Sequence, residues 1–280
     1  MKEINLQEVE EELYQKIGQV GIEIDPQVKE KVLKAQKNER KPLAKDILND
    51  ILLNGEIAHK LQKPLCQDTG LAVLFVEIGS AISFKGSLEE TINSAVKRAY
   101  QDFYFRKSMV TDPLFQRKNT STNLPAIIHW KYKLGDQLKI SFSAKGGGSE
   151  NMSKLIMLKP ADGVQGVKKF VLDTVISAKG NPCPPIIVGL GVGGNFESCA
   201  FLAKKALFRD LQDSHPETEW ANLEDELLKE INMSNIGPQG LGGYTTALAV
   251  KVEYLPCHIA SLPVAVNIQC HSHRHFTLTF

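Results

Sequence analysis

The sequence lacks the features that assign a chain to a specialised class directly. Its formal net charge is only +1, so charge gives no reason to expect nucleic acid or an anionic membrane as a partner. No uninterrupted apolar run is long enough to span a bilayer, and residues 1–15 lack the apolar centre of a signal peptide. No internal repeat or low-complexity linker is present. We therefore expect a globular, cytoplasmic protein.

Cysteine is scarce and never closely paired. The chain has five cysteines, and no two of them form a C-x-x-C pair. That absence argues against zinc ribbons, thioredoxin-like redox motifs and ferredoxins, all of which need close spacing. An odd number of cysteines in a chain without an export signal favours reduced thiols that bind metal, react or lie buried.

Helical and strand patterns are interleaved along the chain without strict alternation. Apolar residues at helical spacing, such as Val9, Leu13 and Ile17, predict a helical N-terminal lobe over about residues 1–60. Residues 127–132 and 138–142 are expected to pair through a turn at Gly135. The predicted fold is a mixed α/β (α+β) domain over residues 1–280, with mixed sheets and flanking helices. Further helices are expected at 87–106, 164–178, 197–211 and 217–232, and further strands at 71–78, 186–190, 245–254, 264–268 and 276–280.

Three of the cysteines lie in separate polar loops, and we interpret them as ligands of a metal cluster. They are Cys66 in PLCQDTG, Cys183 in NPCPP and Cys270 in NIQCHSHRH. Three thiolates from distant parts of a chain can hold a [4Fe–4S] cluster and leave one iron without a protein ligand. Such an iron can act as a Lewis acid on a small oxygen-bearing substrate. Each cysteine taken alone could equally be a buried thiol or part of a turn.

The histidines that follow Cys270 leave a second metal possible. Cysteine and imidazole both suit zinc, although neighbouring residues on one short segment rarely converge on a tetrahedral ion. Arg274, in the same segment, could equally pair with a substrate carboxylate.

Two glycine-rich segments could bind anions. Gly189, Gly191 and Gly194 match the dinucleotide pattern G-x-G-x-x-G, but no second strand directly follows the helix that comes after them. The alternatives are a small anion at the start of that helix or close packing of helix on strand. Residues 145–154 hold three consecutive glycines, which let the backbone approach a ligand closely, and the two flanking lysines favour an acidic ligand. A mobile surface turn is the alternative.

Together the motifs PLCQDTG, KGGGSENMS, NPCPP with GLGVGGNFE, and HIASLPVAVNIQCHSHR resemble class I (iron–sulfur) fumarases. This family includes fumarate hydratase and L(+)-tartrate dehydratase, and the chain resembles its α subunit from about residue 10 to the end. The resemblance implies a hydro-lyase with a [4Fe–4S] cluster. It implies that the cluster ligands are Cys66, Cys183 and Cys270, that the substrate-binding residues are Gln67, Asp68, Arg106, Gly147 and His258, and that Asp68 and His258 are catalytic.

The resemblance also implies partners. A β subunit is expected to complete the active site, in a dimer of heterodimers, and the substrate is expected to be a small dicarboxylate. Fumarate and malate are favoured over tartrate. Cys199 and Cys257 match no family role and are expected to be structural. The alternatives are a non-catalytic iron–sulfur redox or sensor protein and a nucleotide-binding oxidoreductase.

Overall fold

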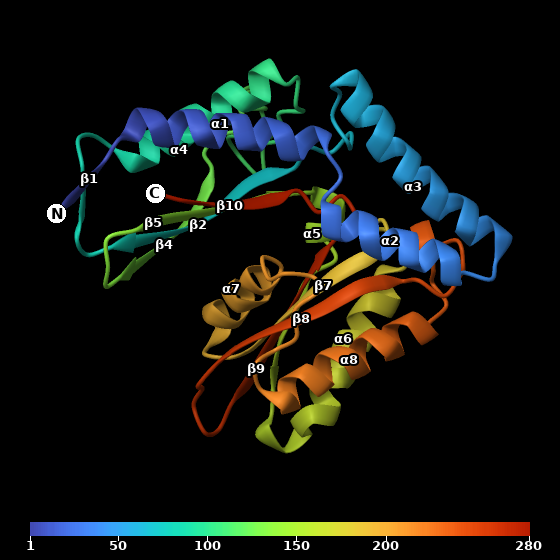
Figure 1. The fold of residues 1–280 in the computed structure, drawn as a ribbon. Coiled ribbons are helices and arrows are strands. Elements are labelled where there is room, and N and C mark those ends of the chain that lie inside the picture. The colour runs from blue at the N-terminus through green and yellow to red at the C-terminus, as the bar shows by residue number, and fades with distance from the viewer. The chain divides into compact units, whose positions relative to one another are not determined.

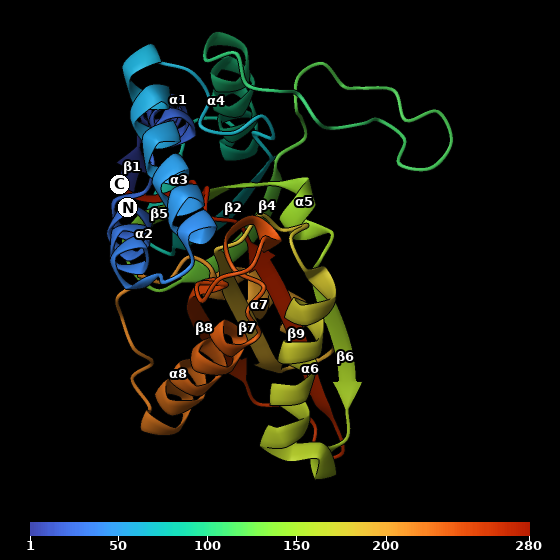
Figure 2. The ribbon, with the colours of Figure 1, turned by 90° about the vertical axis from the view of Figure 1, so that its right-hand side faces the viewer.

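The structure is a computed structural model that describes residues 1–280 as two compact units, labelled by element in Figures 1 and 2. Unit 1 and unit 2 are each assembled from segments that lie far apart in the sequence. None of the helices combines the length and apolar character needed to cross a lipid bilayer. Unit 1 comprises Met1–Asp25, Asn54–Gly147 and Ser272–Phe280, and unit 2 comprises Pro26–Leu53 and Gly148–His271.

A four-stranded mixed sheet of order β10-β5-β2-β4 forms the centre of unit 1. Strand β5 is antiparallel to both β10 and β2, whereas β4 is parallel to β2. β2 has the apolar sequence LAVLFVEIG and takes an inner position, as expected for a strand buried on both faces. The four strands are β2 (Leu71–Gly79), β4 (Ile127–Lys133), β5 (Leu138–Lys145) and β10 (His275–Thr279), and β1 (Lys2–Ile4) pairs separately with β3 (Ile82–Phe84).

The predicted hairpin between residues 127–132 and 138–142 is wrong. β4 and β5 follow each other in the chain but flank β2 on its two sides. The turn around Gly135 instead accepts main-chain hydrogen bonds from the residues that follow β2. Pairing β2 along both edges satisfies its backbone groups while burying its apolar side chains, which a local hairpin between two more polar strands does not achieve.

Helices α1 (Leu6–Ile22) and α4 (Leu88–Asp102) lie side by side over this sheet (Figures 1 and 2). The Asn5 side chain accepts a hydrogen bond from the start of α1 and caps it. The Ser87 side chain accepts one from Glu90 N at 3.2 Å, so the predicted start of the second helix is confirmed. The apolar faces of both helices pack on the sheet and form the core of unit 1.

Unit 2 contains a second mixed sheet, of order β6-β9-β7-β8. In Figure 1, α7 covers one face of this sheet while α6 and α8 cover the other. β7 is parallel to β8, so a parallel partner does follow the glycine-rich turn, but only after two helices. The elements are β6 (Lys154–Leu158), α6 (Gly163–Ala178), β7 (Ile186–Gly193), α7 (Phe196–Ala206), α8 (Thr218–Met233), β8 (Ala247–Leu255) and β9 (Leu262–Gln269).

The glycines of the G-x-G-x-x-G match bring helix and strand together. A Cβ on Gly189 would lie 2.1 Å from the carbonyl oxygen of Ala203, and one on Gly191 would lie 2.1 Å from that of Cys199. Both carbonyls belong to α7, so these positions accept only glycine at this helix–strand distance. The geometry therefore favours the packing interpretation of this motif.

The three N-terminal helices are present but divide between the units. α1 belongs to unit 1 and α2 (Pro26–Asn38) to unit 2, while α3 (Pro42–Leu61) passes from unit 2 into unit 1 after Leu53. The extents of the domain and of the helical lobe stay predictions. The predicted fold class, mixed α/β, is confirmed. Three short elements complete the chain, α5 (Gly147–Glu150), η1 (Pro160–Asp162) and η2 (Pro238–Gly240).

Candidate active site

The loop that carries Cys66 connects α3 to β2 within unit 1. Cys66 and Asp68 are half-buried in this loop, and Gln67 between them is exposed. Gly70 ends the loop with a positive φ of 81°. A Cβ at this position would lie 2.7 Å from the carbonyl of Lys145, so glycine allows the start of β2 to approach the end of β5.

Asp68 is held by the main chain on both of its carboxylate oxygens. Oδ1 accepts a hydrogen bond from Gly70 N at 3.1 Å, and Oδ2 accepts one from Gly147 N at 2.7 Å. The Asp68 carbonyl accepts a third hydrogen bond, from Arg274 Nη2 at 2.9 Å. Asp68 and Gly147, both predicted from the family resemblance to bind substrate, are therefore in direct contact.

Two buried side chains fix the backbone of the same loop. The Tyr100 hydroxyl donates to the carbonyls of Thr69 and Gly70, at 3.0 and 2.9 Å, and burial raises its pKa, so it stays a donor at neutral pH. Asn123 Nδ2 also donates to the Gly70 carbonyl, at 3.2 Å. The Thr69 hydroxyl donates to the main-chain carbonyl of Arg106 at 3.0 Å, which anchors this predicted substrate residue beside the loop. The Arg106 side chain is itself exposed.

Cys183 and Cys270 lie at the same end of the unit 2 sheet. Cys183 precedes β7 and Cys270 follows β9, and the antiparallel register pairs Ile187 with Gln269. The Cys183 side chain is exposed on a residue with a φ of 56°, whereas Cys270 is buried. His271 Nδ1 lies 2.9 Å from the Cys183 carbonyl oxygen, a hydrogen bond that ties the two cysteine loops together.

Gln239 supports the Cys183 loop from η2. Its main-chain N and its Nε2 both donate to the carbonyl of Pro184, at 2.8 and 3.0 Å. Gln239, Tyr100 and Asn123 are functional-site residues that no sequence motif marks. Nothing in the local sequence distinguishes them, because their partners lie 30 or more residues away.

His258 lies at the opposite end of the unit 2 sheet from the two cysteines. It belongs to the loop between β8 and β9, beside the end of β7, whereas Cys183 precedes β7 and Cys270 follows β9. The eight residues of β9 separate the two ends by about 25 Å. The His258 side chain is exposed, and its Nδ1 accepts a hydrogen bond from Ala260 N at 3.1 Å.

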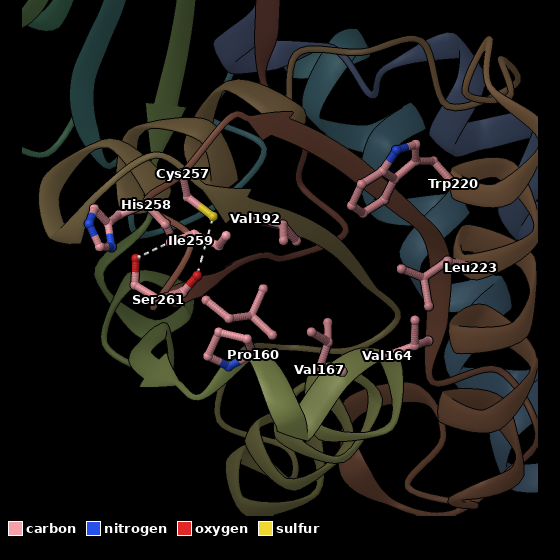
Figure 3. Close-up of a pocket in the computed structure, with 12 residues that line it drawn as sticks. Pro160, Val164, Val167, Val192, Trp220, Leu223, Cys257, His258, Ile259 and Ser261 are labelled. Carbon is pink, nitrogen blue, oxygen red and sulfur yellow. Dashed lines mark hydrogen bonds between the residues drawn. The ribbon is translucent and has the colours of Figure 1, made fainter.

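An apolar pocket of about 390 Å³ adjoins this loop, and Figure 3 shows His258 and Ser261 at one side of it. Most of its lining is aliphatic or aromatic and comes from α6, α8, β7 and the loop. Such a lining supplies no cation to balance a dianion, so the pocket is a poor candidate for dicarboxylate binding. The labelled apolar residues are Pro160, Val164, Val167, Val192, Trp220, Leu223 and Ile259.

Buried polar atoms without hydrogen-bond partners surround Cys270 in the sequence. In unit 2 they include Asn267 Oδ1 and both side-chain atoms of Gln269, and in unit 1 both ring nitrogens of His273 and Nη1 of Arg274. Each such atom costs about 1–3 kcal/mol when it is left unpaired. Their concentration fits a segment whose partners come from a bound group. With the thiol of Cys270, this segment therefore offers donors and acceptors to a bound cofactor or ligand.

The structure contains no group of three or more His, Cys, Asp or Glu side chains arranged to hold a metal ion, and this holds for the three cysteines as well as for Cys270 with its neighbouring histidines. Of the two other cysteines, Cys199 is buried against Ala203 and Ala265, and burial raises the pKa of its thiol. The thiol of Cys257 is exposed and donates to the carbonyl of Ser261.

Comparisons with known proteins agree with the motifs. The family model described as Fumarate hydratase (Fumerase) matches residues 5–279. The "Putative L(+)-tartrate dehydratase subunit alpha" of Methanocaldococcus jannaschii is 43% identical over 262 residues, which cover 91% of this chain and 92% of that protein. The L(+)-tartrate dehydratase subunit alpha of Escherichia coli (strain K12) is 32% identical over 253 residues, which cover 90% and 84%. The family resemblance drawn from the four motifs is confirmed.

Acid should destabilise the folded chain through His273. Burial, with His275 and Lys145 nearby, lowers the pKa of His273 well below its usual value, so the folded state keeps the ring neutral. In the unfolded chain the His273 ring takes up a proton below about pH 6.5, whereas in the folded chain it does not. The free energy of unfolding is therefore highest above that pH and decreases as pH falls below it. We expect the thermal unfolding midpoint to drop less between about pH 7 and pH 5 in His273→Gln than in the wild type.

Circular dichroism melting curves at each pH measure this difference. His59→Gln is the matched control, because His59 is exposed and pairs only with the surface carboxylate of Glu23 at 3.4 Å. Parallel pH dependences in wild type and His273→Gln would contradict the assignment.

Proposed function

The chain belongs to the fumarate hydratase family, and we propose that it is the α subunit of an iron–sulfur hydro-lyase acting on a small dicarboxylate. Members of this family are hydro-lyases, so the predicted enzyme class is confirmed. We propose the reversible hydration of fumarate to malate as the reaction. The dehydration of L(+)-tartrate is the second candidate, because the relatives named above carry that name.

The observation that carries the proposal is the fixed carboxylate of Asp68. Removing water from a 2-hydroxy dicarboxylate requires a group that takes a proton from a weakly acidic C–H. Two main-chain N–H groups hold the Asp68 carboxylate in one orientation, two residues from a cysteine in a polar loop. Preorganisation of this kind is what proton transfer at a defined carbon needs. We therefore assign Asp68 to proton transfer.

Cys66, Cys183 and Cys270 are the proposed cluster ligands. When bound, a cluster held by three thiolates supplies a Lewis-acidic iron that promotes loss of the substrate hydroxyl. Arg274, which donates to Asp68, follows Cys270 by four residues, a stretch of chain that extends at most about 14 Å.

Substrate binding is assigned to groups around the same loop. Arg106, whose main chain is anchored by Thr69, carries an exposed guanidinium suited to a carboxylate. Gln67 is exposed beside Asp68 and can donate or accept a hydrogen bond. The glycines at 146–148 carry no side chain, so a ligand can approach their backbone closely beside the Asp68 carboxylate.

His258 requires a second copy of the chain if it serves this site. It lies about 25 Å along the sheet from the end that carries Cys183 and Cys270. A side chain cannot cover that distance, so we propose that His258 acts on the substrate bound by the other protomer. This assignment agrees with the proposed dimer of heterodimers, in which a two-fold axis makes every such contact reciprocal.

The proposed partner is a β subunit that completes the active site, because the relatives are named as alpha subunits. We further propose that residues 1–280 act as one catalytic domain. A cytoplasmic location is proposed because none of the five cysteines forms a disulfide and the cluster needs reduced thiolates.

The function is tested with the α/β complex purified without oxygen. We expect conversion of fumarate and malate with a higher kcat/KM than dehydration of L(+)-tartrate, whose product is detected as the keto acid. Asp68→Asn should lower kcat by about 10²–10⁴ while the iron content stays unchanged, because the variant loses the proton-transferring carboxylate. A fully cluster-loaded wild-type complex that converts none of the three acids would overturn the proposal.

Cluster binding is tested by replacing each cysteine in turn. Serine at position 66, 183 or 270 should abolish the [4Fe–4S] spectrum after anaerobic reconstitution, because each change removes a thiolate ligand. Cys199→Ser and Cys257→Ser are the matched controls and should retain about four irons per chain. Equal sensitivity at all five positions contradicts the ligand assignment.

Subunit mixing tests the placement of His258. Complexes carrying His258→Ala and complexes carrying Asp68→Asn should each be nearly inactive, because each lacks one group of every site. After the dimers exchange protomers, one site of each hybrid regains both groups, so about a quarter of wild-type activity should return. Protomer exchange is verified by mass spectrometry of tagged chains. If no activity returns, either both residues serve the site of the same protomer or His258 does not act at the site.

A further inference from the structure

A buried arginine without an anionic partner lies beside the Asp68 loop. Arg274 is 2% exposed, and its Nη2 donates to the Asp68 carbonyl at 2.9 Å. Its Nε donates to the Ser272 carbonyl at 3.3 Å, and its Nη1 is buried with no hydrogen-bond partner. No carboxylate of the chain forms an ion pair with this guanidinium, because Asp68 directs its own carboxylate oxygens to Gly70 N and Gly147 N.

This arrangement is unfavourable for the protein alone. A guanidinium stays charged at every pH at which the protein is folded. Burying it against two neutral carbonyls leaves most of its desolvation cost uncompensated. The nearby Tyr100 cannot serve as a counter-ion, because burial raises its pKa and its hydroxyl already donates to two carbonyls. The neighbouring His273 ring is neutral.

We infer that Arg274 binds a carboxylate group of the substrate through Nη1. The inference rests on the proposed function, and it assigns one of the two charges of the dicarboxylate to a residue that the family resemblance did not mark. A guanidinium presents its N–H groups in a planar fork that suits a carboxylate better than it suits a thiolate or a single oxygen. Arg274 contacts the main chain of Asp68, so the carboxylate it binds is positioned next to the proton-transferring residue.

Ligands that differ by one charge separate this role from a structural one. The ligands are malate and its two monoamides, and their dissociation constants are measured by calorimetry on the cluster-loaded α/β complex. In Arg274→Gln, malate should bind about 10- to 100-fold more weakly, because a charge-assisted contact is lost. One of the two monoamides already lacks the carboxylate in question and should bind wild type and variant equally.

Two further variants control the measurement. Arg98→Gln removes a guanidinium of unit 1 that pairs with Glu10 and Glu11 on the surface, and it should leave all three affinities unchanged. Arg274→Lys keeps the charge without the fork and should weaken malate less than Arg274→Gln does. If Arg274→Gln does not load the cluster, Arg274→Lys carries the comparison, again with malate weakened and one monoamide unaffected.

The outcomes distinguish this inference from the proposed function. If the variants weaken malate and both monoamides by the same factor, or weaken none of them, Arg274 supports the loop without binding a carboxylate. In that case the wild-type complex still binds and converts malate, and the proposed function stands. A cluster-loaded wild-type complex that binds none of the three ligands overturns the function and the inference together.

Discussion

The candidate site depends on the two main-chain hydrogen bonds that hold the Asp68 carboxylate. Gly70 N belongs to the same loop, but Gly147 N belongs to the start of α5, just after the end of β5. The two meet because β2 and β5 pair with Leu71 opposite Lys145. A slip of one residue in that register would reverse the faces of β2 and move Gly147 away from the carboxylate. The burial of β2 thus fixes the geometry of the Asp68 carboxylate, the proposed proton-transferring group, outside the sheet.

In unit 2, strand pairing likewise sets the positions of the two cysteines. The pairing of β7 with β9 sets Cys183 and Cys270 at one end of a buried sheet, and His271 and Gln239 then tie down the loops that carry them. Gly189 and Gly191 allow α7 to pack directly on β7, the strand that Cys183 precedes. Rigid strands with short, hydrogen-bonded extensions hold ligands more accurately than free loops do.

The sequence predicted what local chemistry determines. The cysteine loops, the glycine segment at 146–148, the capped start of α4 and most strands follow from residue type and spacing. The predicted β4–β5 hairpin was wrong because β4 and β5 each pair with an edge of the apolar strand β2 instead of with each other. A local sequence pattern cannot predict this strand order. The distance of His258 from Cys183 likewise follows from the direction of the strands. His258 and Cys270 share one sequence motif, and that motif did not predict that they lie at opposite ends of the sheet.

The segment from Asn267 to Arg274 is largely buried and contains polar atoms without hydrogen-bond partners. Such atoms are costly because they are buried. The unpaired buried atoms of Gln269 and the unpaired Nη1 of Arg274 oppose folding of the chain alone. Groups that bind only the folded state reverse this balance, since their binding free energy adds to stability. Under the proposed function, a group bound at Cys270 would therefore order this segment as it binds, in the way that metal binding and folding are coupled in metalloproteins.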